Sequence, residues 1–160
     1  MKTNKNEYIN DSIHGLILLS ELEKRIISSI GFNRLHDVYQ NSTVYLTFPS
    51  NRTKRFEHSI GTMKLGSDMF YNSVLNTDNN TLNNFFKDLT KKLIDDKIYI
   101  DSIKTFDSNS KFENSLIPNN LNTLFSDKKD EKEKILKIYI LLIKSIRIAA
   151  LLHDIGHTPF

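Results

Sequence analysis

Residues 135–160 read ILKIYILLIKSIRIAALLHDIGHTPF and contain the most apolar run of the chain. Lys137, Lys144 and Arg147 interrupt this run, and a helix that crossed a bilayer would have to neutralise or snorkel all three charges at considerable cost. The pattern therefore predicts a buried helix of a soluble protein. Residues 127–134, DKKDEKEK, open this helix with acidic groups in the first turn, where they favour the helix dipole.

Composition narrows the class of protein. A chain of 160 residues, with 39% apolar and 26% charged residues, is typical of one globular domain. It has no cysteine, which excludes disulfides and thiolate nucleophiles, so any metal must be held by histidines and carboxylates. No apolar run of the signal-peptide kind follows the N-terminus, so we expect a cytoplasmic location and no membrane partner. The net charge of +3 comes from scattered lysines, which permits nucleic acid as a partner but does not indicate it.

The first block, residues 11–40, predicts two helices that are broken at a glycine. Ser20 can cap the first helix, because Glu23 stands at the capping-box position three residues later. After Gly31, residues 32–39 place apolar side chains at the i, i+3, i+7 spacing of a second amphipathic helix.

Two further elements are expected before the middle of the chain. Residues 44–48, VYLTF, are β-branched and aromatic and are closed by Pro49, so they predict an extended segment or short strand. From Arg55 to Val74 apolar residues recur on one helical face, and small residues such as Gly61 let a neighbour approach closely. This pattern predicts a core helix that starts near Arg55.

The middle of the chain is diluted in apolar residues. Residues 76–134 are rich in Asn and Lys, and their low hydrophobicity predicts an insertion, part of which is mobile. Apolar patches at 82–93 and 98–100 predict local helical or extended order within it. We expect little chemistry from this insertion.

Three residues can form a metal site. His153 and Asp154 are an adjacent imidazole and carboxylate at a helix end, and such ligands at about 2.0–2.2 Å suit zinc, manganese or iron. His58 is the best third ligand, because it lies on the predicted core helix, where a buried imidazole needs a reason. Each histidine taken alone is more often a hydrogen-bonded interior residue. The three together favour a divalent metal site.

The residues after the His-Asp pair suggest a turn at the metal. Gly156 can end the helix in a left-handed conformation, and the threonine and proline at 158–159 prevent the helix from resuming. His157 then lies close to the ligands, where a general acid or a phosphate contact would be placed. The alternative is that His157 caps carbonyls at the helix C-terminus.

Arg55 is the candidate for binding a phosphate. Its guanidinium presents a fork of donors that matches phosphate oxygens, and it lies three positions before His58 on the same side of a helix. The alternative is a surface ion pair with Glu57. Arg52 and Lys54 add positive charge nearby, which favours a polyanionic ligand.

Five short sequence blocks of the chain occur in an order that is also found in a known protein family. They are DSIHG at 11–15, FNRL at 32–35, VYLTFPS at 44–50, RFEHSIGTM at 55–63 and LHDIGHTPF at 152–160. In this order they resemble the HD-domain phosphohydrolases, most specifically the branch of deoxynucleoside triphosphate (dNTP) triphosphohydrolases. A His-Asp pair alone is a weak signal, whereas five ordered blocks are a specific one. The asparagine-rich middle has no counterpart in the resemblance.

The resemblance implies an all-α fold, an HD-domain helical bundle with a short extended or hairpin-like segment. Residues 8–160 are then the N-terminal part of the domain, and residues 76–134 are an insertion within it. The family's fourth metal ligand is an aspartate on a later helix, which has no counterpart before Phe160. We therefore expect the fold to be incomplete at its C-terminus and this stretch to be inactive or impaired by itself.

The resemblance also implies roles for particular residues. The family's metal ligands correspond here to His58, His153 and Asp154, and the ion is manganese, magnesium, iron or zinc. Arg55 resembles the phosphate-binding arginine, His157 the histidine that assists phosphate-ester cleavage, and Gln40 a contact to the sugar. The implied reaction converts a dNTP and water to a deoxynucleoside and inorganic triphosphate, in a full-length protein that is a homo-oligomer.

Two other readings stay open. One keeps the HD site in a phosphodiesterase that acts on another nucleotide or on a nucleic-acid end. The other is a non-catalytic HD module that binds a nucleotide or a partner. The blocks that precede His58 favour the dNTP branch, because a generic HD phosphodiesterase does not need them.

Overall fold

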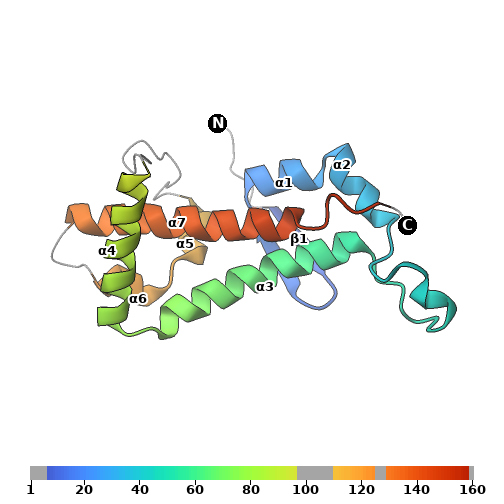
Figure 1. Ribbon diagram of the computed structural model, residues 1–160, viewed down its shortest axis with the longest axis horizontal. Helices are drawn as coiled ribbons and strands as arrows, with labels where there is room; N and C mark the ends of the chain where they lie inside the picture. Colours follow the sequence, from blue (N-terminus) through green and yellow to red (C-terminus); the bar gives the residue numbers. More distant parts are fainter. Residues whose placement is uncertain (1–6, 97–109, 125–128, 159–160) are drawn as a thin grey trace. The chain divides into compact units, whose positions relative to one another are not determined.

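Helices make up most of the chain in the computed structural model, which describes residues 7–96, 110–124 and 129–158 (Figure 1). Among these residues, seven α-helices and two 3₁₀ helices accompany one two-stranded antiparallel sheet. The predicted all-α class is therefore confirmed. The chain divides into unit 1, Met1–Gly66 with Ile146–Phe160, and unit 2, Ser67–Ser145.

A hairpin begins unit 1. Strands β1 (Glu7–Asp11) and β2 (Gly15–Leu19) pair in antiparallel register. In the turn between them, the Asp11 carboxylate accepts a hydrogen bond of 2.8 Å from the backbone N–H of His14. Gly15 has a φ of 67°, a left-handed conformation that favours glycine. The hairpin-like element of the fold thus lies near the N-terminus and not at residues 44–48, where the sequence suggested an extended segment.

Helix α1 (Glu21–Ile27) starts where it was predicted to start. The Ser20 hydroxyl accepts a hydrogen bond of 3.3 Å from the backbone N–H of Glu23, and the Glu23 carboxylate accepts one of 2.8 Å from the backbone N–H of Ser20. These reciprocal bonds form the predicted capping box and satisfy two N–H groups that have no partner inside the helix.

The predicted helix break at Gly31 is wrong. Helix α2 (Ile30–Asn33) contains this glycine, and the break falls earlier because the Ser29 side chain caps a new helix there. The second amphipathic helix expected over residues 32–39 is also shorter. It consists of the end of α2 followed by the 3₁₀ helix η1 (Arg34–His36).

The strand predicted at residues 44–48 is wrong as well. This segment overlaps the 3₁₀ helix η2 (Ser42–Leu46), and Phe48 after it is 63% exposed. In the described part of the chain no strand pairs with it, and β-propensity without a partner strand does not make a sheet. Nearby, Tyr39 and Lys54 form only an isolated antiparallel bridge.

Two long helices deliver the candidate ligands. Helix α3 (Arg55–Asn76) begins at Arg55, as predicted, and helix α7 (Lys129–Leu152) has acidic residues in its first turn, also as predicted. Because α7 ends at Leu152, the His-Asp pair lies in the turn after it. Gly156 has no positive φ, so the prediction that it ends the helix in a left-handed conformation is wrong. The helix has already ended four residues earlier. Pro159 lies outside the described residues.

The core of unit 1 brings these elements together. Its buried apolar members are Ile17, Ile27, Phe32, Leu35, Phe56, Ile60, Met63 and Leu151. At its edge Arg147, 2% exposed, donates from Nε to the Glu23 carboxylate at 2.6 Å and from Nη2 to the Leu18 carbonyl at 2.9 Å. Glu23 is itself 1% exposed. This buried ion pair joins the last two turns of α7 to the start of α1.

Unit 2 has an apolar core of its own. Helices α4 (Asn79–Asp95), α5 (Lys111–Leu116) and α6 (Asn119–Leu124) lie there with parts of α3 and α7. The buried residues of its core are Val74, Leu82, Phe86, Ile117, Leu121, Ile135, Leu136, Ile138, Tyr139, Ile140 and Ile143. The apolar patch predicted at 82–93 falls on α4, whereas the patch at 98–100 lies outside the described residues. That residues 76–134 form an insertion stays a prediction.

A helix that crosses a bilayer needs about 20 consecutive, mostly apolar residues. None of the helices in the described ranges combines the length and the apolar character that a membrane span needs.

Candidate metal centre

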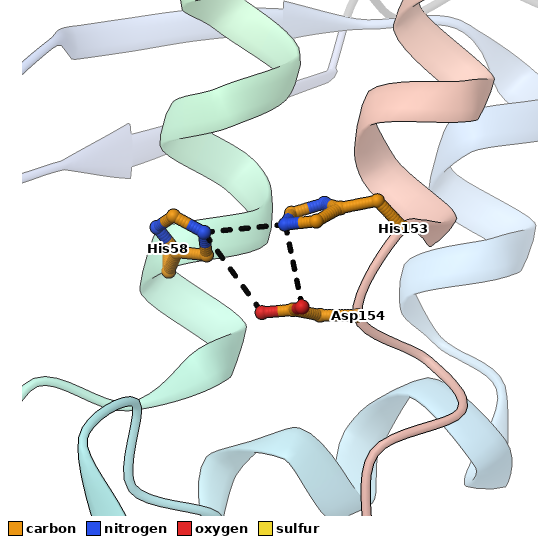
Figure 2. Close-up of side chains that lie close together, drawn as sticks. All are labelled: His58, His153 and Asp154. Atoms are coloured by element: carbon orange, nitrogen blue, oxygen red, sulfur yellow. Dashed lines mark hydrogen bonds and ion pairs between the residues drawn. The ribbon is translucent and has the colours of Figure 1, made fainter.

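Three of the predicted site residues converge in unit 1 (Figure 2). His58 comes from the first turn of α3, and His153 and Asp154 come from the turn that follows α7. One potential ligand atom from each lies within 4.8 Å of the other two. The Nε2 atoms of His58 and His153 are 3.2 Å apart, close enough for both to bind one ion through bonds of about 2.0–2.1 Å.

The orientation of His153 is fixed from its other side. Its Nδ1 lies 2.6 Å from the backbone carbonyl of Ala150, and a carbonyl oxygen can only accept a hydrogen bond. Nδ1 therefore carries the proton, and the lone pair of the neutral ring is on Nε2, the atom that faces His58. Histidines that bind metals are typically oriented in this way, by an N–H bond to a carbonyl or carboxylate.

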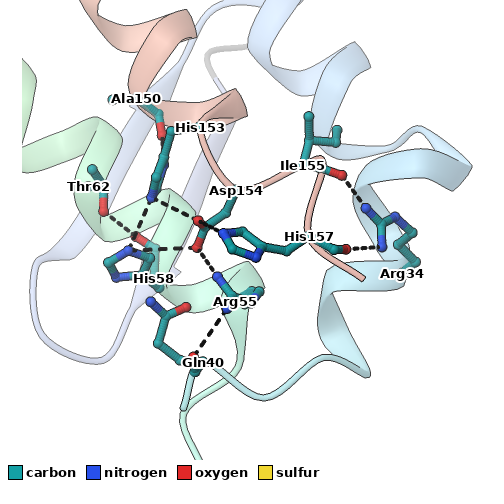
Figure 3. A network of polar contacts seen from close by, with 10 residues as sticks. All are labelled: Arg34, Gln40, Arg55, His58, Thr62, Ala150, His153, Asp154, Ile155 and His157. Carbon is teal, nitrogen blue, oxygen red and sulfur yellow. Dashed lines mark hydrogen bonds and ion pairs between the residues drawn. The ribbon is translucent and has the colours of Figure 1, made fainter. Parts of the chain in front are cut away.

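The carboxylate of Asp154 lies at the centre of the polar contacts shown in Figure 3. Its side chain is only 7% exposed, and Oδ2 accepts a hydrogen bond of 2.7 Å from Nη1 of Arg55. The Nε2 atoms of His153 and His58 lie 3.4 Å from Oδ1 and 3.8 Å from Oδ2. The arginine offsets the cost of burying the carboxylate charge, and the carboxylate faces both imidazoles.

Arg55 is paired inside the site and not with Glu57, the alternative that the sequence left open. Its Nη2 donates to the backbone carbonyl of Gln40 at 3.3 Å (Figure 3). Two atoms beside these contacts, Nε of Arg55 and Oε1 of Gln40, are buried and have no hydrogen-bond partner among the described residues. Buried polar atoms without partners are rare in proteins and call for an explanation such as a bound ligand.

His157 reaches the same carboxylate from another direction. Its ring is 55% exposed, and its Nε2 lies 3.4 Å from Oδ1 of Asp154. Its backbone N–H donates to the backbone carbonyl of Asp154 at 3.1 Å. His157 is therefore adjacent to the three-residue group, with its ring turned toward a side-chain carboxylate.

Arg34 is a residue of this region that the sequence did not single out. Its guanidinium donates to the backbone carbonyls of His157, at 2.8 Å, and of Ile155. These partners are 123 and 121 residues away in the chain and are main-chain atoms, so no side-chain pattern signals the contact. Only the motif at 32–35 pointed to this position.

The two other basic residues near the site lie over tyrosine rings. The Lys54 ammonium is 3.4 Å from the ring centroid of Tyr39, and the Arg52 guanidinium is 5.6 Å from that of Tyr45. These two cations, which are close to Arg55 in the sequence, are each stabilised by an aromatic ring.

The electrostatics of His58 favour a neutral ring. Burial lowers the pKa of His58 below 6.5, the carboxylate of Asp154 acts to raise it, and the neighbouring His153 and Arg55 act to lower it further. The neutral imidazole is the form that binds a metal, so this environment keeps the ligand available.

The donor set fits a divalent ion. Two imidazole nitrogens and one carboxylate oxygen suit zinc, manganese or iron. The rings of His58 and His153 are 37% and 36% exposed, so a bound ion would keep positions open to solvent and substrate. Such an arrangement suits a catalytic metal better than a closed structural one.

Comparison with known proteins connects this geometry to a group of relatives. No family model matches the chain. It is 49% identical over 59 residues to an uncharacterized protein of Methanocaldococcus jannaschii, a match covering 37% of the chain and 13% of that protein. It is 29% identical over 149 residues to a putative HD domain-containing protein of Acanthamoeba polyphaga mimivirus, covering 93% of the chain and 23% of that protein.

A third relative has a named activity. The deoxynucleoside triphosphate triphosphohydrolase SAMHD1 of Homo sapiens is 47% identical over 53 residues, which are 33% of the chain and 8% of that protein. The chain spans less than a quarter of the length of each of these relatives. Over the matched stretches it is similar to HD-domain proteins, one of them a dNTP triphosphohydrolase.

Proposed function

We propose that this chain supplies the metal centre of an HD-type phosphohydrolase that converts a dNTP and water to a deoxynucleoside and inorganic triphosphate. The observation that carries the proposal is the convergence of His58, His153 and Asp154, with the Nδ1–H of His153 bound to a carbonyl and its Nε2 turned to the other imidazole. The similarity to SAMHD1 supports the choice of substrate.

The three residues would hold one divalent ion. When bound, such an ion lowers the pKa of a coordinated water and polarises a phosphoryl oxygen. Manganese, magnesium, iron and zinc are the candidates, and the donor set does not single out one of them.

Arg55 and Gln40 would bind the nucleotide beside the ion. Arg55 uses Nη1 and Nη2 for Asp154 and the Gln40 carbonyl, which leaves its buried Nε–H for a phosphate oxygen. The buried Oε1 of Gln40 can accept a hydrogen bond from a hydroxyl of the sugar. Both assignments give partners to atoms that otherwise lack them.

His157 would act on the leaving group. Attack of water on the α-phosphorus breaks the bond to the 5′ oxygen, which must take up a proton. The His157 ring is half-exposed, and its Nε2 lies 3.4 Å from Oδ1 of Asp154. A proton held there can pass to the 5′ oxygen.

The setting of the whole protein follows from the same proposal. A nucleotide is the expected partner, and we expect a homo-oligomer located in the cytoplasm.

The test is product analysis with each of the four dNTPs in the presence of Mn²⁺. Triphosphate and deoxynucleoside should appear, and His153→Ala should remove them. His36→Ala is the matched control, because this histidine stacks on Phe56 outside the three-residue group, and its products should persist. If His153→Ala released triphosphate at the unaltered rate, the proposal would be wrong. Hydrolysis of cyclic nucleotides or nucleic-acid ends in place of dNTPs would favour the phosphodiesterase, and Mn²⁺ binding without any product would favour the non-catalytic module.

A further inference from the structure

The conformation of the turn after α7 does not depend on the glycine at position 156. This glycine has no positive φ, and a Cβ added to it would meet no atom within 4 Å. An alanine would therefore fit without strain. Residues 153–158, hereafter the ligand turn, have two short-range backbone bonds of their own, and further contacts come from elsewhere in the chain.

Arg34 makes such contacts. Its guanidinium donates from Nη1 to the carbonyl of His157 at 2.8 Å and from Nη2 to the carbonyl of Ile155. The backbone of Arg34 is anchored in the core of unit 1, because its neighbours Phe32 and Leu35 are both 0% exposed there. One side chain thus ties the ligand turn to the buried part of the N-terminal block.

The two bonds also decide which way His157 points. The carbonyls of Ile155 and His157 both turn toward Arg34, and the His157 ring turns the other way, toward Asp154 (Figure 3). Carbonyls that follow the end of a helix have no helical partner, and a cation near a helix C-terminus is favoured by the dipole as well. A guanidinium suits this task because its fork can bind two oxygens at once.

We propose that Arg34 is a positioning residue, which acts through the ligand turn to hold the His157 ring beside Asp154. The clamp on the turn is independent of any chemistry. The effect on turnover rests on the proposed function, in which His157 donates a proton to the leaving group.

The clamp is tested by hydrogen exchange on the metal-free chain. In Arg34→Ala the amides of the ligand turn, including those of Ile155 and His157 that now donate to Leu152 and Asp154, should lose protection. Amides of α1 and α3 should keep theirs. Arg34→Lys can reach only one carbonyl and should give an intermediate loss.

Two controls make the test specific. Arg25→Ala removes an exposed arginine from α1 and should leave the ligand turn protected. Gly156→Ala should also leave it protected, because the added Cβ meets open space. Unchanged protection of the turn in Arg34→Ala would overturn the proposal, and so would an equal loss in α1, α3 and the turn, since that would mark a residue of general structural importance.

The action through His157 is tested by a double-mutant cycle with Mn²⁺ affinity measured alongside. Arg34→Ala should lower kcat by about 10–100-fold, the usual effect of removing a residue that orients a functional group, while Mn²⁺ still binds. In a His157→Ala background, Arg34→Ala should lower kcat by less than about twofold, because the effects of residues that act as a unit are not additive. An equal cost in both backgrounds would refute the action through His157. Absence of turnover in the unaltered chain would count against the proposed function, and hydrogen exchange would still decide on the clamp.

Discussion

The two units of the molecule differ in the basic residues they use. All five histidines of the sequence, and all of its arginines, belong to unit 1, whereas residues 67–145 of unit 2 have lysine as their only basic residue. Neutral imidazoles bind metals and guanidinium forks bind carboxylates, carbonyls and phosphates, while lysine is a strongly hydrated point charge. Histidine and arginine, the residue types that make up most of the candidate site, thus occur only in unit 1.

The buried polar groups show the same contrast. In unit 1 the carboxylates of Glu23 and Asp154 are buried against arginines that are 2% and 14% exposed at the side chain. In unit 2 the buried Glu113 pairs with Lys144, whose side chain is 29% exposed. The ion pairs of unit 1 are therefore less exposed to water than the ion pair of Glu113 and Lys144 in unit 2.

The largest difference should appear when a buried carboxylate in each unit loses its charge. Asp154→Asn should raise the dissociation constant for Mn²⁺ by more than about a hundredfold, because loss of a supporting residue alone costs about 10–100-fold. Glu113→Gln, equally buried, should leave it within about twofold, because Glu113 is not one of the three candidate ligands. Isothermal titration calorimetry measures both. Similar losses in the two variants would erase the functional contrast between the units.

The next largest effect concerns stability. Glu23→Ala leaves the charge of Arg147 buried without its partner, and should lower the free energy of unfolding by about 3–5 kcal/mol. Glu113→Ala should cost about 1–3 kcal/mol, because the partly exposed Lys144 can turn toward water. Urea denaturation of the metal-free chain gives both values, and a larger cost for Glu113→Ala would contradict the assignment of the stronger electrostatic dependence to unit 1.

A cavity in unit 2 should separate stability from function. Leu121 is 0% exposed, and Leu121→Ala should cost about 2–5 kcal/mol of unfolding free energy. The folded fraction should bind Mn²⁺ as the unaltered chain does. Calorimetric titration below the unfolding temperature checks this, and a weakened site in the folded variant would show that unit 2 supports the metal centre.

The smallest effect is on the pH dependence of stability and concerns His58 of unit 1. Burial lowers the pKa of His58 below 6.5, so at falling pH the unfolded chain takes up this proton before the folded chain does. The contribution of His58 is therefore intact above pH 6.5, and stability is lost as the pH falls through 6.5 toward the lowered pKa. Between about pH 5 and 7 the unfolding free energy of the metal-free chain should fall less steeply in His58→Gln. Identical slopes in urea denaturation would contradict this.

Features with local causes could be predicted from the sequence. The capping box of Ser20 and Glu23 needs residues only three positions apart, and the starts of α3 and α7 follow from helical spacing and first-turn charge. The strand at residues 44–48 failed because β-propensity depends on a partner strand, which the described chain does not provide there. The hairpin was missed although its turn residues, Asp11 and Gly15, carry the usual signals.

The site could be predicted only as a set of residue types. His58 lies 95 residues from His153, and no spacing rule states that their Nε2 atoms come within 3.2 Å. Arg55 was expected to face a phosphate, and its pairing with Asp154 is a tertiary contact that the sequence does not show. The contacts of Arg34 could not be predicted, because its partners are backbone carbonyls.

We propose that His58, His153 and Asp154 bind one divalent ion. The most direct measurement is an anomalous difference map from crystals of the chain soaked in Mn²⁺. We expect a single peak about 2.0–2.2 Å from an imidazole nitrogen of each histidine and from a carboxylate oxygen of Asp154. A map without a peak at this position at saturating Mn²⁺, or a peak that leaves His58 uncoordinated, would contradict it.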